Sequence, residues 1–233
     1  MTRYDAPVRG LFVTGTDTGV GKTLVACEIV RRLRARGLGP GVLKPIETGV
    51  GPGGPEDCLA LFDAAGLESG IAEVCPQQFA LPAAPNVAAA AEGRKVDLQA
   101  IDRAVDRVTA AHECVIFEGA GGLLVPICDG FTMADLALRY GLPLVVVCRA
   151  ALGTLNHTRL TLEVAASRGL TVAGLVISHS GGTPSEADIA NLEDLRQNPG
   201  VPFAGELPYV VPGNRVPEDA LDIDLLLRAM SQA

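Results

Sequence analysis

The segment Thr16–Thr23, TDTGVGKT, has the residue types of a phosphate-binding loop. It follows the apolar run GLFVTG and opens a helical pattern, which is the strand, turn and helix context that this motif requires. Backbone N–H groups of Thr18–Thr23 would face one concavity at the positive end of the helix, where a phosphate binds. Lys22 would contact the β- and γ-phosphates, and the Thr23 hydroxyl would ligate Mg²⁺. A strand-to-helix turn with incidental glycines is the alternative, and it accounts poorly for Gly-Lys-Thr at a helix start.

The first glycine of the usual pattern is missing from this loop. Thr16 stands at that position, and the nearest glycine is Gly15, one residue earlier. We expect Gly15 to supply the tight turn, while Gly19 and Gly21 permit positive φ and close approach of the backbone to a phosphate.

A second lysine lies in the segment VLKPIETG. Lys44 is followed by Pro45, which forces an extended exit from the preceding strand. We expect Lys44 at the carboxyl end of a central strand, opposite the phosphate loop, where its ammonium would contact a transferring phosphoryl group or an anionic substrate. A surface lysine with its ammonium in water is the alternative. Thr48 and Gly49 follow in a turn, and the Thr48 hydroxyl would bind substrate.

Two acidic residues are candidates for a metal site. Glu118 ends the apolar strand of VIFEGAGGLLVP, and an acidic residue at that point usually serves Mg²⁺, directly or through water. An exposed carboxylate at a strand end is the alternative. Asp57 begins the helical segment EDCLALF after a Gly/Pro loop, and by itself it indicates only a helix N-terminal acid.

The elements that would position these residues alternate along the chain. Short runs that are apolar throughout indicate strands covered on both faces, and helical patterns lie between them. This alternation predicts an α/β fold with a mostly parallel, doubly wound sheet and helices on both faces. Because ligands of such sheets bind beyond the carboxyl ends of the strands, we expect one sheet edge to gather the functional loops. These loops are Gly15–Thr23, Lys44–Gly49, Glu118–Gly122, Arg149–His157 and Ser178–Gly182.

The expected elements have approximate bounds. Strands are predicted at GLFVTG, GVLKP, CVIFEG, LPLVVVC, VAGLVIS and PFAGELP, and helices at Lys22–Arg36, Asp97–His112, Thr132–Tyr140, Gly153–Arg168 and Glu218–Met230.

Of the 233 residues, 48% are hydrophobic, which is enough to form one sizeable core. We therefore expect one soluble domain over residues 1–233. The net charge of -8 disfavours nucleic acid and anionic membranes as partners. No long apolar run and no signal-peptide pattern occur, so we expect a cytoplasmic protein. The six cysteines form no C-x-x-C pair, which favours buried free thiols over a zinc or disulfide framework.

In chain order, VTGTDTGVGKT, KPIETG, ED-LAL, EGAGGLLVP, LGTLNHT and GELP resemble the dethiobiotin synthase family, from about Phe12 to Tyr209. The resemblance implies a P-loop NTPase fold and a homodimer with its substrate site at the interface. It implies an ATP- and Mg²⁺-dependent ligase of biotin synthesis that acts on 7,8-diaminopelargonic acid and CO₂. The carbamate of one amine is phosphorylated by ATP to a carbamic–phosphoric anhydride, and the neighbouring amine closes the cyclic urea.

The resemblance also assigns roles to residues by position. Lys44 and Lys22 would be catalytic, and Thr23, Asp57 and Glu118 would ligate Mg²⁺. Substrate would contact Thr18, Lys44, Thr48 and the turn Gly153, Thr154, Leu155 and Asn156, whose N–H groups bind the substrate carboxylate across the interface. The nucleotide would contact Thr18, Gly19, Val20, Gly21, Lys22, Thr23, Leu24, Asp57, Glu118, Gly119, Ala120, Gly121, Ser178, His179, Leu207, Pro208 and Tyr209.

Two positions depart from the family pattern. Ser178 stands where the family often has the asparagine that reads adenine, so the resemblance leaves the base preference open. LPAAPN replaces a segment that often has serine and histidine, and we assign no catalysis to Ala84 or Asn86.

Two alternatives remain at this point. Partition and division-site switch ATPases of the ParA and MinD type carry a second lysine where this chain has Asp17. A cobyrinate-type amide ligase is the other alternative, and that family carries a glutaminase domain downstream.

Overall fold

The computed structural model describes residues 3–4, 8–68, 70–179, 184–210 and 216–232. Residues 180–182 of the predicted loop Ser178–Gly182 therefore lie outside the described part of the chain.

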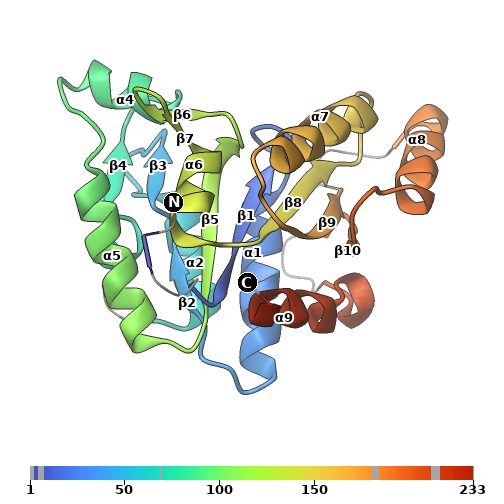
Figure 1. Ribbon diagram of the computed structural model, residues 1–233, viewed down its shortest axis with the longest axis horizontal. Coiled ribbons are helices and arrows are strands. Elements are labelled where there is room, and N and C mark those ends of the chain that lie inside the picture. Colours follow the sequence, from blue (N-terminus) through green and yellow to red (C-terminus); the bar gives the residue numbers. More distant parts are fainter. Residues whose placement is uncertain (1–2, 5–7, 69, 180–183, 211–215, 233) are drawn as a thin grey trace.

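The central feature is a six-stranded sheet in which every neighbouring pair is parallel (Figure 1). Its spatial order is β10 (Phe203–Leu207), β9 (Val172–Ser178), β8 (Leu144–Arg149), β1 (Gly10–Gly15), β5 (Val115–Gly122) and β2 (Gly41–Leu43). Because the chain adds β2 and β5 on one side of β1 and later β8 to β10 on the other, the order reverses at β1. This is the doubly wound arrangement predicted from the sequence, and the reversal places a crevice beyond the carboxyl end of β1.

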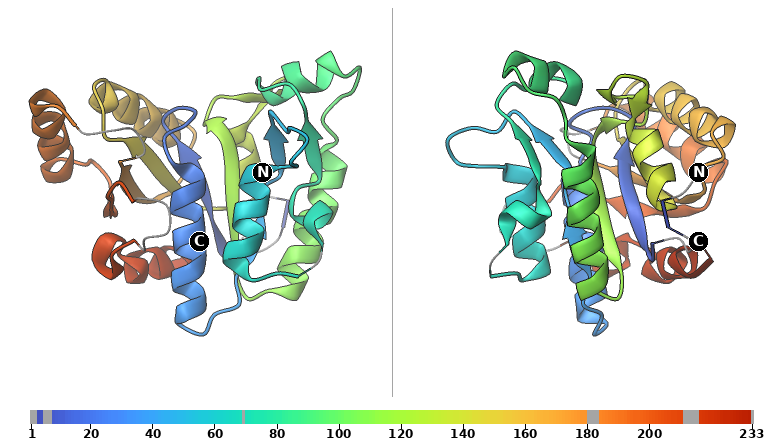
Figure 2. Two further views of the ribbon diagram at one scale, coloured as in Figure 1. Left: turned by 180° about the vertical axis from the view of Figure 1, so that it is seen from behind. Right: turned by 60° about the vertical axis from the view of Figure 1, so that its left-hand side comes forward.

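Helices cover both faces of this sheet (Figure 2). Along β1, Leu11 and Val13 pack into one core with three of the helices, whereas Phe12 packs into the other core. The first face carries α1 (Lys22–Ala35), α2 (Glu56–Ala65) and α9 (Ile223–Gln232). The second face carries α5 (Leu98–Ala111), α6 (Met133–Tyr140), α7 (Thr154–Ser167) and α8 (Glu186–Gln197).

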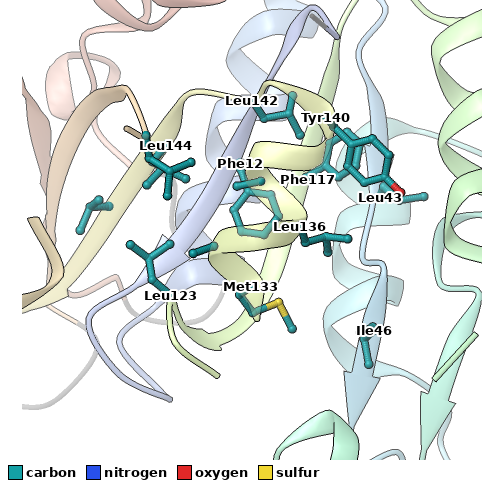
Figure 3. Packing of buried hydrophobic residues seen from close by; sticks show 14 of the residues in the cluster. Phe12, Leu43, Ile46, Phe117, Leu123, Met133, Leu136, Tyr140, Leu142 and Leu144 are labelled. Carbon is teal, nitrogen blue, oxygen red and sulfur yellow. The ribbon is translucent and has the colours of Figure 1, made fainter. Parts of the chain in front are cut away.

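The second core is built around stacked aromatic rings (Figure 3). Phe12 of β1 lies 6.5 Å from Phe117 of β5, and Phe117 lies 5.7 Å from Tyr140 of α6, measured between ring centroids. The Tyr140 hydroxyl donates to buried Asp102, which also accepts two hydrogen bonds from Arg139. The polar end of the buried tyrosine is therefore satisfied, as burial of a hydroxyl requires.

Smaller elements cover the carboxyl edge of the sheet (Figure 1). β3 (Ile46–Thr48) pairs in parallel with β4 (Gln77–Phe79), and β6 (Pro126–Cys128) pairs with β7 (Phe131–Thr132). Helix α4 (Pro85–Ala91) packs against the β3–β4 pair, whereas α3 (Ile71–Val74) contacts α2, α5 and β2.

The structure corrects two expectations. β2, which precedes Lys44, is an edge strand of the sheet and not a central one. The predicted helix Glu218–Met230 is divided into a 3₁₀ turn, Glu218–Ala220, and α9, because Leu221 bridges to Gly205 and the Asp222 side chain accepts from the N–H of Leu225 at the new helix start.

The expectation of free, mostly buried cysteines is met. All six cysteines are free, and five of them are buried. Over the described ranges, no helix combines the length and the apolar character needed to cross a membrane.

Candidate active site

The phosphate loop joins β1 to α1 as its sequence predicts. Gly21, the last residue before the helix, is the N-cap of α1 with φ 94°, and no side chain caps the helix there. The first N–H groups of a helix have no partner within the helix, so this end of α1 is suited to an anion. One amide differs from expectation, because the N–H of Thr18 donates to the Asp17 carboxylate at 2.7 Å.

Gly15 lies directly beneath this loop. A Cβ atom at Gly15 would lie 2.7 Å from the carbonyl oxygen of Asp17 and 2.7 Å from the Val20 side chain. Only glycine therefore fits under the turn. This geometry agrees with the expectation that Gly15, and not residue 16, permits the tight turn.

Lys44 is buried, with 2% of its surface exposed, so the alternative of a surface lysine is wrong. Its ammonium lies 2.7 Å from Glu118 Oε1, 2.8 Å from Asp57 Oδ2 and 3.3 Å from the carbonyl oxygen of Gly119. The residue directly follows β2, and the pairing of Leu43 with Phe117 sets Lys44 beside Glu118 on β5.

Thr23 meets the same two carboxylates. Its hydroxyl oxygen lies 2.8 Å from Asp57 Oδ1 and 2.8 Å from Glu118 Oε1. Asp57 is in the first turn of α2, and Thr23 is in the first turn of α1. Three residues from separate elements, Thr23, Asp57 and Glu118, therefore converge.

The oxygens of Thr23, Asp57 and Glu118 suit a Mg²⁺ site that is completed by water and phosphate. They do not suit a site formed entirely by protein ligands. Nowhere in the described ranges do three or more His, Cys, Asp or Glu side chains gather to hold an ion. Mg²⁺ prefers few carboxylates, retained waters and phosphate oxygens, and two carboxylates with one hydroxyl match that preference. The second oxygen of Glu118, Oε2, is buried and has no hydrogen-bond partner in the described part of the chain.

The electrostatics of the site follow from burial and proximity. Burial alone lowers the pKa of Lys44, but Glu118 and Asp57 outweigh burial and raise it. Burial raises the pKa of Asp57, but the adjacent Lys44 ammonium outweighs burial, and the result is a lowered pKa. Burial and then repulsion from Lys44 lower the pKa of Lys22.

A cavity of about 510 Å³ joins the phosphate loop to the Lys44 segment. Several predicted site residues line it: Thr18, Gly19, Gly21, Lys22, Thr23, Lys44, Thr48, Asp57, Ala120 and Gly121. Ala84 lines it too, whereas Asn86 is exposed at the start of α4. Others lie behind its wall, because Glu118 and Val20 are fully buried and Leu24 packs against the core.

The remaining residues predicted to contact the nucleotide, Ser178, His179 and Leu207–Tyr209, lie at the carboxyl ends of β9 and β10. His179, Pro208 and Tyr209 line a second cavity of about 510 Å³, whereas Ser178 and Leu207 are fully buried. The His179 ring contacts Glu206, which also accepts two hydrogen bonds from Arg196.

The predicted substrate turn Gly153–Asn156 opens α7 and lies outside the residues that line the first cavity. Gly153 is the N-cap with φ 89°, and the Thr154 side chain is buried. Neighbouring Leu152 is 71% exposed.

Sequence reasoning missed part of the cavity wall. Glu47, Val125 and the segment 82–85 line the cavity and were not among the expected residues. The sequence shows that Pro55 before α2 offers no side-chain acceptor for the N-terminus of that helix, but it does not indicate which residue replaces the cap.

This chain is similar to known proteins in sequence and in fold. Residues 9–213 match a family described as an AAA domain. The ATP-dependent dethiobiotin synthetase BioD of Anaeromyxobacter dehalogenans strain 2CP-C is 51% identical over 174 residues, 75% of this chain and 78% of the relative. The protein of the same name from Bacillus subtilis subsp. natto is 34% identical over 96% of this chain and 99% of the relative. The signal recognition particle receptor FtsY of Elizabethkingia anophelis, solved with GDP, shares the fold with a TM-score of 0.52 at 14% identity, over 99% of this chain and 65% of that one.

Removing the ammonium of Lys44 should leave its two carboxylates without a buried cation. We expect Lys44→Met to lower the free energy of unfolding by about 3 kcal/mol in Mg²⁺-free buffer. Added Mg²⁺ should raise the melting temperature of this variant more than that of the wild type. Thermal unfolding with chelator and with Mg²⁺ measures both effects, and Lys95→Met at an exposed position is the control. Wild-type stability of Lys44→Met without Mg²⁺ would contradict this account.

Proposed function

Because this chain belongs to the ATP-dependent dethiobiotin synthetase family, we propose that the cavity between the phosphate loop and Lys44 is where it closes the urea ring of dethiobiotin. The chain is an ATP-dependent ligase of biotin synthesis. One observation carries the assignment of the site: two buried lysines, Thr23 and Asp57 line one cavity, and Glu118 directly behind its wall contacts both Lys44 and Thr23.

The reaction joins one carbon to two nitrogens. One amine of 7,8-diaminopelargonic acid attacks CO₂, forms an N–C bond and loses a proton to give a carbamate. A carbamate oxygen takes the γ-phosphoryl group of ATP and releases ADP. The second amine then attacks the carbonyl carbon of the mixed anhydride, and phosphate leaves as the ring closes. The chemistry is therefore mostly a matter of holding anions in line.

Lys22 and Lys44 are suited to that task. Carbamate and triphosphate repel each other, so cations must lie between them. Lys22 would hold the β- and γ-phosphates at the start of α1. Lys44 would face the transferring phosphoryl group from the opposite wall, with its charge secured by Glu118 and Asp57.

Thr23, Asp57 and Glu118 would hold Mg²⁺, with the buried, unpartnered Oε2 of Glu118 in support. When bound, the ion would neutralise phosphate charge and orient the triphosphate. Thr18 and Thr48 would contact the diamine from the cavity wall.

The base of the nucleotide would lie against the ends of β9 and β10, near Ser178, His179 and the segment Leu207–Tyr209. The Ser178 hydroxyl is fully buried and has no hydrogen-bond partner in the described ranges, so it offers a base edge no exposed donor or acceptor. Base selection would then depend on His179, Tyr209 and backbone groups, and we expect more than one triphosphate to be accepted.

The turn Gly153–Asn156 would bind the substrate carboxylate of a second copy, in a cytoplasmic homodimer. Two observations support a partner here. The turn does not line this chain's own cavity, and two large apolar side chains near it are exposed, Leu152 at 71% and Leu160 at 58%. The N-terminus of α7 is a suitable carboxylate site.

The assigned reaction predicts one product. Incubation with the diamine, bicarbonate, Mg²⁺ and each nucleoside triphosphate separately should yield the cyclic urea, scored by mass spectrometry. We expect product with ATP and with at least one other triphosphate, because Ser178 cannot read the base edge. Absence of product with every triphosphate would contradict the function, and product with ATP alone would contradict the account of the base site.

Lys44→Ala should reduce turnover at least about a thousandfold, as removal of a group that stabilises the transferring charge does, while nucleotide affinity changes little. Single-turnover assays and calorimetric titration with ATP measure the two quantities. Lys95→Ala, which removes an exposed lysine, should leave both unchanged. Near-normal turnover of Lys44→Ala would reject the assigned role.

The homodimer has its own test. Leu160→Asp should convert a dimeric wild type to monomers in sedimentation velocity and raise the KM for the diamine, because a charge would be buried at the interface. Ile189→Asp on α8 replaces another exposed apolar residue and is the matched control. A monomeric wild type, or a dimeric Leu160→Asp, would contradict the proposal.

A further inference from the structure

Helix α2 begins without a capping residue of its own. Its N-cap is Pro55, which has no side-chain acceptor, yet the first N–H groups of a helix need partners from elsewhere. Glu47 of β3 supplies them, although it lies ten residues before Asp57 in the sequence. Its Oε1 accepts from the N–H of Asp57 at 3.0 Å, and its Oε2 accepts from the N–H of Cys58 at 2.9 Å. These are the second and third residues of α2, the amides that a capping side chain normally serves.

The Glu47 carboxylate accepts no further hydrogen bond within the described ranges. The residue is 6% exposed, and within the described ranges no lysine or arginine lies at ion-pair distance from it. A buried carboxylate requires compensation, and here two backbone N–H groups and the positive end of α2 provide it. Glu47 and the start of α2 therefore stabilise each other.

This contact acts on Asp57 directly. The residue whose N–H is held by Glu47 is the one whose carboxylate contacts Lys44 and Thr23. The body of α2 is fixed by packing of Cys58, Leu61 and Ala64 into the core. Of these three residues only Cys58 is in the first turn, and the loop 50–54 just upstream contains three glycines and, as described, one isolated bridge. The contacts from Glu47 therefore add a restraint on the upstream side of this turn.

We propose that Glu47 is a positioning residue, which holds the first turn of α2 so that the Asp57 carboxylate meets Lys44, Thr23 and the Mg²⁺ of the nucleotide. The proposal rests on the proposed function for the identity of the ion. One segment, residues 44–48, thus carries both the ammonium that contacts Asp57 and the carboxylate that fixes its backbone.

A direct role of Glu47 in contacting the diamine is the competing account, because Glu47 also lines the cavity. Both of its oxygens accept backbone hydrogen bonds, which favours positioning. The two accounts differ in what a variant changes: the requirement for Mg²⁺ or the KM for the diamine.

The test combines hydrogen exchange with Mg²⁺ dependence in Glu47→Ala and Glu47→Gln. Loss of a helix cap should speed amide exchange at the start of α2 by roughly tenfold in Glu47→Ala, and less in Glu47→Gln, which keeps one acceptor oxygen. The remainder of α2 should be unchanged. The Mg²⁺ concentration for half-maximal rate should rise roughly tenfold, while the KM for the diamine changes little.

Asp97→Ala is the matched control, because the Asp97 side chain caps α5 by accepting from Ala100 at 3.0 Å, away from the site. It should speed exchange at the start of α5 and leave the Mg²⁺ requirement unchanged. Should Glu47→Ala fail to fold, Glu47→Gln carries both measurements.

Three results would overturn the proposal: wild-type exchange at the start of α2, faster exchange with an unchanged Mg²⁺ requirement, or a raised KM for the diamine with an unchanged Mg²⁺ requirement. If the wild type makes no dethiobiotin, the proposed function fails. Exchange at α2 and the calorimetric affinity for Mg²⁺ with ATP then still decide the role of Glu47.

Discussion

The ion pairs of Lys44 with Asp57 and Glu118 are the contacts on which the rest of the site depends. They join the end of β2, the start of α2 and the middle of β5, three elements far apart in sequence. Burying an ammonium and a carboxylate is costly. A buried pair is stable only where its geometry is good and its remaining hydrogen-bonding groups have partners. Here the Lys44 ammonium also contacts the Gly119 carbonyl, and Thr23 contacts both carboxylates. These contacts hold the three elements together at one edge of the sheet without any contribution from a nucleotide.

Strand order explains why these groups meet. β2 lies at the edge of the sheet, but it pairs with β5, and the register Leu43 with Phe117 continues to Lys44 beside Glu118. β5 in turn pairs with β1, whose end carries the phosphate loop. Parallel strands present their carboxyl ends on one edge, so a chain that places β5 between β1 and β2 brings Lys22, Glu118 and Lys44 together.

The sequence predicts the strands of the main sheet well, because apolar runs such as LPLVVVC read directly as strands buried on both faces. It also identifies Lys44 and Glu118, since each ends such a run. It does not predict that β2 lies at the edge, because strand order depends on crossovers and not on the apolar pattern. It does not predict the contact of Glu47 with α2 either. The partners of Glu47 are backbone N–H groups, which do not depend on the side chains that the sequence specifies. The break of the last helix at Leu221 and Asp222 depends on a bridge to Gly205 and on a local cap, which the helical pattern does not contain.

Charge balance links the binding of cations to the binding of phosphate at this site. The ammonium groups of Lys22 and Lys44 balance the carboxylates of Asp57 and Glu118, and burial together with repulsion from Lys44 lowers the pKa of Lys22. If Asp57 and Glu118 accepted a divalent ion, their negative charge would be divided between that ion and Lys44. The largely buried site would then carry an excess of positive charge. A bound triphosphate would remove that excess. Asp57 is 42% exposed at its side chain and Glu118 is not exposed at all. Under the proposed function, Asp57 would therefore be the partner that Lys44 exchanges for a phosphate oxygen, and Lys44 would turn toward the transferring group while Glu118 keeps its charge in place.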